Sequence, residues 1–309
     1  MKLVNSFLAV SLLVVCILSL VGCGKESSMN GSEKIYYLNY HDGDVFTDSI
    51  KDTFKKKAES SGIKVDFLDA KGDINLQVDQ LRGIIAEKPG AIVLLPVDGV
   101  AIAPVVQEAN EMKIPVIVLN RSVEGGKAIS VTSDNKEAGR MQGEYMAKIL
   151  PQNAKIVYFI GQNGNTASDD RWLGFKETCL DKRPDVQVLA SAIADFNRTE
   201  GFKTMTIWLK LFPQINGVVA ANDEMALGAI QALKDANRLN GCIVSGVDAN
   251  ADALNAIKNG EMSQTVKQDG VGQAEGALKL IDMYMKGQNP TENMIIPFSS
   301  ITKENLPQT

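Results

Sequence analysis

Histidine is almost absent from this chain, since His41 is the single histidine among 309 residues. That scarcity excludes a His-rich metal site, and nothing around His41 suggests a Ser-His-Asp triad. The chain also lacks a Gly-x-Ser-x-Gly turn, a His-Glu-x-x-His pair and a phosphate-binding loop. The usual sequence signs of hydrolytic, metal-dependent and nucleotide-dependent enzymes are missing, and we expect neither a metal nor a cofactor.

Runs of basic residues are missing as well. The chain has 32 Lys and Arg against 37 Asp and Glu, which gives a formal net charge of −5. Without a basic stripe, binding to nucleic acid or to anionic lipid headgroups is not expected. The remaining composition, 45% hydrophobic and 22% charged, is that of a well-packed globular protein.

One long apolar run is present, from Leu3 to Val21, and Lys2 precedes it. Such a run is typical of a secretory signal peptide, or of an uncleaved helix of about 20 residues that spans a bilayer. Its end, Leu20-Val21-Gly22-Cys23, resembles the bacterial lipobox, in which the chain is cut before a cysteine that then receives a diacylglycerol. We therefore expect a signal peptide over residues 1–22, lipidation of Cys23 and a flexible tether over residues 23–33.

Cysteine is scarce in the rest of the chain, where only Cys179 and Cys242 remain. A disulfide between them is possible outside the cytoplasm. Cys179 lies in a helical pattern and Cys242 opens a strand-like run, and these positions favour two small buried residues instead.

Short apolar runs alternate with helix-length amphipathic runs along the whole chain. The expected strands cover residues 35–39, 65–68, 91–96, 115–120, 156–161, 186–190, 217–221, 242–247 and 263–267. The expected helices cover residues 45–61, 74–87, 101–112, 171–181, 199–211, 224–236, 251–259 and 271–285. Near-continuous apolar strands between helices predict parallel sheets covered on both faces. Because there are about ten strands, we expect an α/β protein with two doubly wound sheets.

Polar side chains and one aromatic residue follow these strands, where open α/β sheets bind ligands. They are Asp44, Phe46, Asn120, Arg121, Asn165, Arg171, Asn222, Asp223, Asp248 and Gln268. Taken singly, Asp44 and Asn222 are also explained as helix N-caps, the arginines as surface residues, and Phe46 and Phe196 as core. Together, carboxylates, amides, guanidiniums and two aromatic rings are the groups that pair buried hydroxyls and stack on a sugar ring.

Several motifs resemble the ribose/galactose class of periplasmic binding proteins. The stretch Ala221-Asn222-Asp223-Glu224-Met225-Ala226-Leu227-Gly228-Ala229 is similar to a signature of that class, and Ser245-Gly246-Val247-Asp248-Ala249 is similar to its galactose/glucose branch. Further matches are Ile114-Pro115-Val116 with Leu119-Asn120-Arg121, then Ser133-Asp134-Asn135 and Ala194-Asp195-Phe196. The resemblance runs from about Lys34 to about Pro297.

The resemblance implies two α/β lobes, joined by three crossing strands, that close on a ligand. By analogy the N-terminal lobe covers residues 34–133 and 269–297, and the C-terminal lobe covers residues 134–268 and 298–309. It also implies the sugar-contacting residues, each by its matching motif position: Asp44, Phe46, Asn120, Arg121, Asn165, Arg171, Phe196, Asn222, Asp248 and Gln268.

Three departures from the galactose branch put the identity of the sugar in doubt. Asn165 and Ala167 stand where that branch has a histidine and an aspartate, and Phe196 stands where it has a tryptophan. The segment Leu150-Pro151-Gln152-Asn153-Ala154 carries no carboxylate where the branch binds calcium. We therefore expect no structural calcium, and a roomier or water-filled pocket end near residues 165–167.

The leading hypothesis is a monomeric lipoprotein that binds a monosaccharide or polyol and delivers it to the permease of an ABC importer. A sensory receptor that feeds a histidine kinase or chemoreceptor would have the same binding site and stays open as an alternative. A transcriptional regulator with the same core would need an N-terminal DNA-binding segment in place of an export signal. Asp44 and Asp248 could be imagined as a glycosidase pair, yet hydroxyl acceptors beside arginine explain them better.

Overall fold

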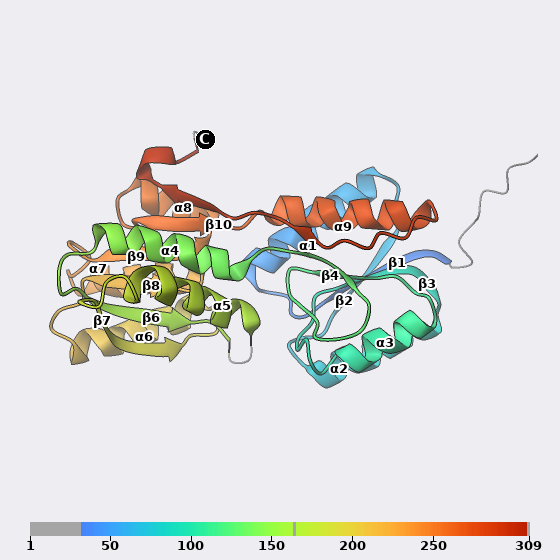
Figure 1. Ribbon diagram of the computed structural model, residues 1–309, viewed down its shortest axis with the longest axis horizontal. Helices are drawn as coiled ribbons and strands as arrows, with labels where there is room; N and C mark the ends of the chain where they lie inside the picture. Colours follow the sequence, from blue (N-terminus) through green and yellow to red (C-terminus); the bar gives the residue numbers. More distant parts are fainter. Residues whose placement is uncertain (1–31, 163–164, 308–309) are drawn as a thin grey trace, which may run out of the picture.

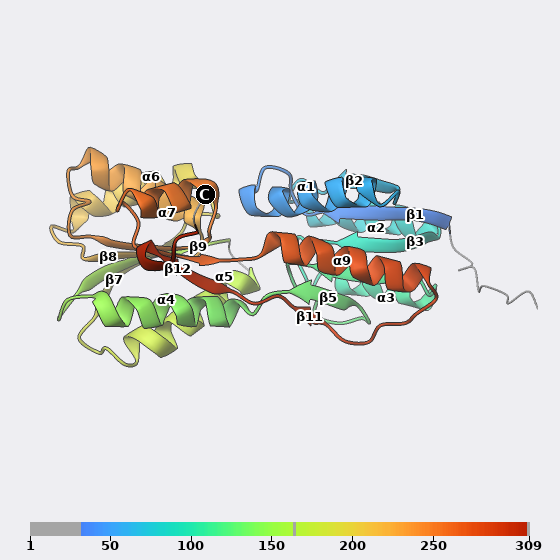
Figure 2. The same cartoon turned by 90° about the horizontal axis from the view of Figure 1, so that it is seen from above.

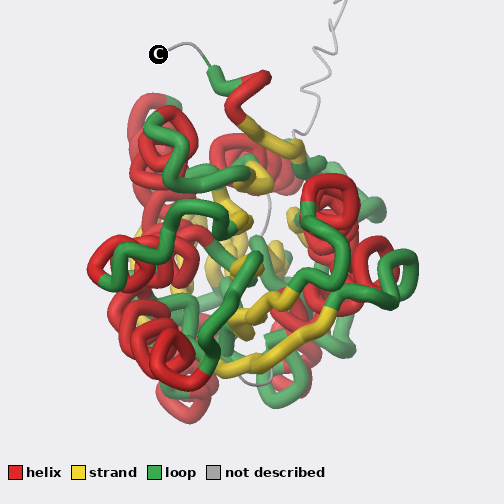
Figure 3. Tube along the Cα trace, turned by 90° about the vertical axis from the view of Figure 1, so that its left-hand side faces the viewer, coloured by secondary structure: helices red, strands yellow, loops and turns green. Residues whose placement is uncertain are grey.

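Residues 32–162 and 165–307, which the computed structural model describes, form two six-stranded sheets. The sheets belong to two lobes that lie side by side along the long axis of the molecule (Figure 1). Viewed along that axis, the strands lie inside and the helices surround them (Figure 3). The prediction of an α/β fold with two doubly wound lobes is therefore confirmed.

The N-lobe contains the sheet with strand order β11-β5-β4-β3-β1-β2, and every pairing in it is parallel. Its strands are β1 (Ser32–Asn39), β2 (Val65–Asp69), β3 (Pro89–Leu94), β4 (Val116–Leu119), β5 (Ile129–Thr132) and β11 (Met294–Ile295). Its helices are α1 (Val45–Ser60), α2 (Ile74–Ala86), α3 (Ala103–Glu111) and α9 (Gly270–Met285). Apolar residues of α1 and α9 pack on one face of the sheet, and those of α2 and α3 pack on the other.

The C-lobe contains the sheet with strand order β12-β10-β9-β8-β6-β7. Its strands are β6 (Lys155–Ile160), β7 (Gln187–Ile193), β8 (Gly217–Ala220), β9 (Ile243–Asp248), β10 (Gln264–Lys267) and β12 (Ser299–Thr302). Its α-helices are α4 (Asn135–Ile149), α5 (Thr166–Phe175), α6 (Arg198–Leu211), α7 (Asp223–Asp235) and α8 (Ala251–Lys258). A π-helical turn (Lys176–Leu180) extends α5, and a 3₁₀ turn (Lys303–Asn305) follows β12. Helices α6, α7 and α8 cover one face, and α4 and α5 cover the other.

The chain passes between the lobes three times within the described residues: from β5 to α4, from β10 to α9 and from β11 to β12 (Figure 2). Strand β12 is antiparallel to β10, which differs from the parallel pairing that the sequence predicted throughout. The reason is the direction of the crossings. Strand β10 runs toward the hinge, whereas β12 enters the C-lobe from the hinge and runs away from it.

The stretch from residue 129 to residue 175 differs most from the sequence prediction. Strand β5 and helix α4 were not predicted. Arg171 does not open a helix as predicted, because α5 begins five residues earlier, at Thr166. Asn165 is the N-cap of α5, and its Oδ1 accepts a hydrogen bond from Ala167 N at 2.9 Å.

Helix starts place polar side chains at the carboxyl ends of the strands. Eight of the nine α-helices in the described part of the chain begin after an Asp or Asn whose side chain accepts a backbone hydrogen bond. Such caps pair backbone N–H groups that the first helical turn leaves open. Because strand ends and helix starts meet at the same edge of each sheet, these residues gather where the two lobes face each other.

Both cysteines of the described ranges carry free, buried thiols, Cys179 among the residues packed by α4 and α5 and Cys242 in the opposite core. The sequence left open whether the two cysteines form a disulfide or are small buried residues. The structure supports the second alternative. No helix among residues 32–162 and 165–307 is long and apolar enough to cross a bilayer. The expected signal peptide and the site of lipidation, Cys23, lie outside the described residues.

Candidate ligand-binding site

The ten residues predicted from the sequence line one pocket between the lobes, together with Thr47 and Ala167. The N-lobe contributes Asp44, Phe46, Asn120 and Arg121. The C-lobe contributes Asn165, Arg171, Phe196, Asn222 and Asp248, and Gln268 follows β10 at the hinge. The structure therefore brings all ten together, and their contact with a ligand stays a prediction.

Arg171 lies at the floor of this pocket and is 4% exposed. Its Nε donates to Asn135 Oδ1 at 3.0 Å, its Nη1 to the Ala221 carbonyl at 2.5 Å and its Nη2 to Gln268 Oε1 at 3.2 Å. Burial lowers the pKa of the guanidinium, and the nearby carboxylate of Asp248 opposes that shift. A guanidinium has five N–H donors, so two remain for a ligand.

Asp248 lines the pocket from the C-lobe. It ends β9 with a φ of 122°, and Ala249 follows with a φ of 58°, so two non-glycine residues in succession have left-handed backbone. Such strain has a typical cost of about 1–3 kcal/mol per residue and is common at ligand sites. Burial raises the pKa of the Asp248 carboxyl well above its ordinary value, and the positive charge of Arg171 opposes this.

Asp223 holds the strained turn after Asp248 in place. Its side chain is fully buried and accepts hydrogen bonds from Asn250 N at 3.0 Å and from Thr265 Oγ1 at 2.7 Å. Ala249 N donates to the same threonine hydroxyl at 3.1 Å. Burial raises the pKa of Asp223 to about 7, and these hydrogen bonds oppose the shift. Asp223 thus acts on the pocket through the backbone that carries Asp248.

Phe196 is positioned by a glycine and an asparagine. It has a φ of 55°, and its carbonyl accepts a hydrogen bond from Asn222 Nδ2 at 3.2 Å. Its ring lies so close to Gly161 that a Cβ there would fall 2.0 Å from Phe196 Cζ. Only glycine at position 161 leaves room for the ring in this position. Asn222 is also the N-cap of α7, since its Oδ1 accepts from Met225 N at 3.0 Å.

The N-lobe side of the pocket is held by residues that the sequence analysis did not single out. Asn120, with a φ of 66°, donates from Nδ2 to Gln273 Oε1 at 3.0 Å. The Arg121 guanidinium stacks 3.5 Å above the centre of the Tyr40 ring, and its Nη1 donates to the Pro96 carbonyl at 3.3 Å. Cation–π contact of this kind fixes the direction of the guanidinium.

Asp44 has both of the roles that the sequence left open. It is the N-cap of α1, because its Oδ1 accepts from Thr47 N at 2.8 Å and from Thr47 Oγ1 at 3.0 Å. It also lines the pocket, and Thr47 lines it too. The sequence signal for Thr47 was its place in the first turn after Asp44. Asn135 stood in one of the matching motifs without a predicted role, and no pattern in the sequence indicated Gln273.

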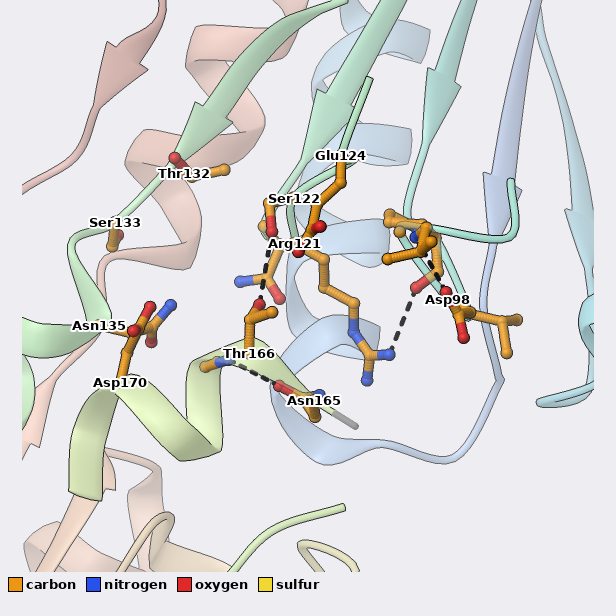
Figure 4. A pocket seen from close by; sticks show the side chains of 16 residues that line it. Asp98, Arg121, Ser122, Glu124, Thr132, Ser133, Asn135, Asn165, Thr166 and Asp170 are labelled. Carbon is orange, nitrogen blue, oxygen red and sulfur yellow. Dashed lines mark hydrogen bonds between the residues drawn. The ribbon is translucent and has the colours of Figure 1, made fainter. Parts of the chain in front are cut away.

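A larger cavity of about 360 Å³ opens beside the pocket, and we call it the side cavity. It shares Asn120, Arg121, Asn165 and Ala167 with the pocket. Figure 4 shows its other polar side chains, which include Asp98, Ser122, Glu124, Thr132, Thr166 and Asp170. Ser122 Oγ and Thr166 Oγ1 lie 3.4 Å apart across the two lobes. The side cavity therefore lies at the pocket end where the galactose branch would have a carboxylate in place of Ala167.

The charges that line the pocket balance, because Asp44 and Asp248 face Arg121 and Arg171. An uncharged ligand leaves that balance undisturbed. Amide groups of Asn120, Asn165, Asn222 and Gln268 supply further donors and acceptors, and Phe46 and Phe196 supply one ring from each lobe. Among the described residues, no group of three or more His, Cys, Asp or Glu side chains is arranged to hold a metal ion.

Two doubly wound lobes with polar side chains of both converging on one cleft define the class of two-lobed ligand-binding proteins. Residues 35–289 match the family of the periplasmic binding protein domain. The chain belongs to the periplasmic binding protein family.

Individual relatives agree with this assignment. A xylitol-binding protein of Mycolicibacterium smegmatis is 32% identical over 94% of this chain and 83% of its own length. The ribose import binding protein RbsB of Bacillus subtilis is 33% identical over 83% of each chain. An ABC transporter solute binding protein from Bacillus halodurans, solved with bound myo-inositol, is 32% identical with a TM-score of 0.84, covering 90% of this chain and 97% of that one. These relatives are binding proteins, and the chain is a binding protein and not an enzyme.

Proposed function

We propose that the chain binds a monosaccharide or a related polyol between its lobes and delivers it to the permease of an ABC importer. The observation that carries the proposal is the convergence of two carboxylates, two guanidiniums, four amides and two aromatic rings on one pocket. Neutral polyhydroxylated molecules need this set, because each hydroxyl taken out of water must be paired. The names of the relatives, which bind or import ribose and xylitol, support the same ligand class.

The energetics of such a site are sufficient for transport. Micromolar affinity corresponds to about −8 kcal/mol. Hydrogen bonds to charged groups contribute about 1.5–3 kcal/mol each, and Asp44, Asp248, Arg121 and Arg171 can form several of them. The binding free energy beyond about −8 kcal/mol offsets the cost of ordering the side chains and closing the lobes.

We further propose that the exported protein is a lipoprotein, attached to the outer face of the cell membrane through Cys23. The support is the sequence Leu20-Val21-Gly22-Cys23 and the Gly/Ser-containing segment that follows it. A tether of this kind keeps the binding lobes close to a membrane-embedded permease and raises their local concentration there.

A thermal-shift panel tests the ligand class. Ribose, xylose, glucose, galactose, myo-inositol and xylitol are added to the purified protein, and the unfolding temperature is measured. A ligand at about 100 times its Kd adds about 2.7 kcal/mol, which raises the Tm of a protein of this size by roughly 5–10 °C. At least one member should give this shift, and Asp248→Asn should abolish it. A panel without any shift at saturating concentrations contradicts the proposal.

A further inference from the structure

The space in the pocket is small compared with the space beside it. The pocket itself holds about 40 Å³. The side cavity holds about 360 Å³ and continues from the pocket past Asn120, Arg121, Asn165 and Ala167. A ligand ring held between the lobes therefore has free room on this side as well as on the opposite flank.

The side cavity lies on a flank where the lobes already meet. A side-chain hydrogen bond joins the two lobes here, away from the hinge. It lies between Ser122 Oγ and Thr166 Oγ1, which are 3.4 Å apart. On the opposite flank, the groove between residues 40–45 and residues 195–200 opens to about 450 Å³, and no hydrogen bond between described residues spans it. Closure around the existing contact would narrow that groove first and would leave the side cavity in place.

The lining of the side cavity is polar and carries more negative than positive charge. Figure 4 shows the carboxylates of Asp98, Glu124 and Asp170 around it, and the guanidinium of Arg121, which is stacked on Tyr40. Hydroxyls of Ser122, Thr132 and Thr166 complete the lining. Hydroxyl groups and carboxylates accept hydrogen bonds from a sugar, whereas an added anion would meet the like charges of three carboxylates.

We propose that the side cavity is a second subsite, which takes a neutral hydroxylated substituent of the ligand and rejects an anionic one. The preferred ligands are then glycosides, up to the size of a disaccharide, of the ring that the pocket holds. Uronates and phosphorylated sugars bind poorly. This inference rests on the proposed function, because it assigns a further part of the same ligand.

Matched ligand triplets test the subsite by calorimetry on the exported chain. Each triplet pairs a parent with a neutral glycoside and an acid: glucose with maltose and glucuronate, galactose with melibiose and galacturonate, myo-inositol with galactinol and inositol monophosphate. For the triplet whose parent binds, the glycoside should bind within threefold of the parent or more tightly, and the acid should bind at least tenfold more weakly. A glycoside at least tenfold weaker than its parent overturns the subsite while the proposed function stands. If no member of any triplet binds, the subsite fails, and the proposed function fails with it only if ribose, xylose and xylitol also give no thermal shift.

Two variants assign the effect to the side cavity. Thr166→Trp fills it from the exposed first turn of α5 and should weaken the glycoside at least tenfold, with the parent changed less than threefold. Thr291→Trp, at an exposed position far from the cleft, is the matched control and should change neither. Asp170→Asn should improve binding of the acid by threefold to tenfold. Equal losses for parent and glycoside in Thr166→Trp, or no gain in Asp170→Asn, would contradict the assignment.

Discussion

Arg171 Nη2 donates to Gln268 Oε1 at 3.2 Å, and this hydrogen bond joins the floor of the pocket to the hinge. The same guanidinium also binds Asn135, the first residue of α4 after another crossing of the hinge. One buried side chain thus contacts two of the three passages between the lobes. A ligand that engages the two remaining N–H donors of Arg171 would act on the hinge directly.

Arg171→Lys should weaken ligand binding by at least tenfold, because an ammonium cannot reproduce three donors in a fixed plane. It should also lower the free energy of unfolding by about 1–3 kcal/mol, since a buried carbonyl or amide oxygen loses its partner. Calorimetry and urea unfolding measure the two effects. Arg82→Lys is the control, because Arg82 forms an exposed ion pair with Glu108 outside the cleft. Unchanged affinity in Arg171→Lys would remove the residue from the site.

Gly161→Ala should weaken binding at least tenfold by displacing the ring of Phe196, since the new Cβ would lie 2.0 Å from Cζ. Overpacking of this kind typically costs about 1–3 kcal/mol of stability. Gly83→Ala serves as the control, because a Cβ at that position in α2 meets nothing within 4 Å. The control should keep full affinity and gain up to about 1 kcal/mol in stability. Equal affinities of the two variants would show that the Phe196 ring does not contact the ligand.

Asp223→Asn should change the pH dependence of stability. Because the pKa of Asp223 is raised to about 7 in the folded protein from 3.8, the folded state holds a proton that the unfolded state releases between these values. The contribution of Asp223 to stability should therefore fall as the pH rises from about 4 to about 7, and level off above. Urea unfolding at a series of pH values measures how stability depends on pH. Asp223→Asn should show a smaller fall in stability over this range than the parent, whereas Asp235→Asn, at an exposed position, should show the same fall as the parent. An identical slope in Asp223→Asn would refute the shift.

Cys23→Ala should prevent acylation and alter processing of the leader, because a lipobox needs the cysteine thiol. Cells expressing each form are labelled with a radioactive fatty acid, and the protein is recovered by immunoprecipitation. The parent should carry the label and the variant should not. Label retained by Cys23→Ala would exclude attachment through this residue.

The sequence predicted most of the sheet strands and ten of the twelve pocket residues. The family resemblance supplied Phe196, and apolar strands and the polar residues after them leave strong local signals. Helix α4 left none. Its buried residues include Gly139, Gly143 and Gln142 in place of large apolar side chains. These glycines allow close packing, since a Cβ at Gly139 would fall 2.0 Å from the Arg171 carbonyl and one at Gly143 would fall 2.1 Å from Thr178 Oγ1. A helix that packs through glycine has no apolar stripe for a sequence pattern to detect.

The supporting residues of the site were hidden for a related reason. Asn135 and Gln273 act through hydrogen bonds to residues far away in the sequence, Arg171 and Asn120, and such pairs leave no spacing signal. The role of Gly161 depends on the position of a ring 35 residues later. Long-range contacts of this type are visible only once the fold is known.

Closure of the lobes on a sugar or polyol is the central claim, and small-angle X-ray scattering tests it most directly. The radius of gyration is measured for the exported chain alone and with a saturating amount of the ligand that gives the largest thermal shift. The account predicts a smaller radius in the presence of ligand, because neither lobe alone carries all the groups of the pocket. A non-binding sugar should leave the radius unchanged. An identical radius with and without the binding ligand would contradict the account.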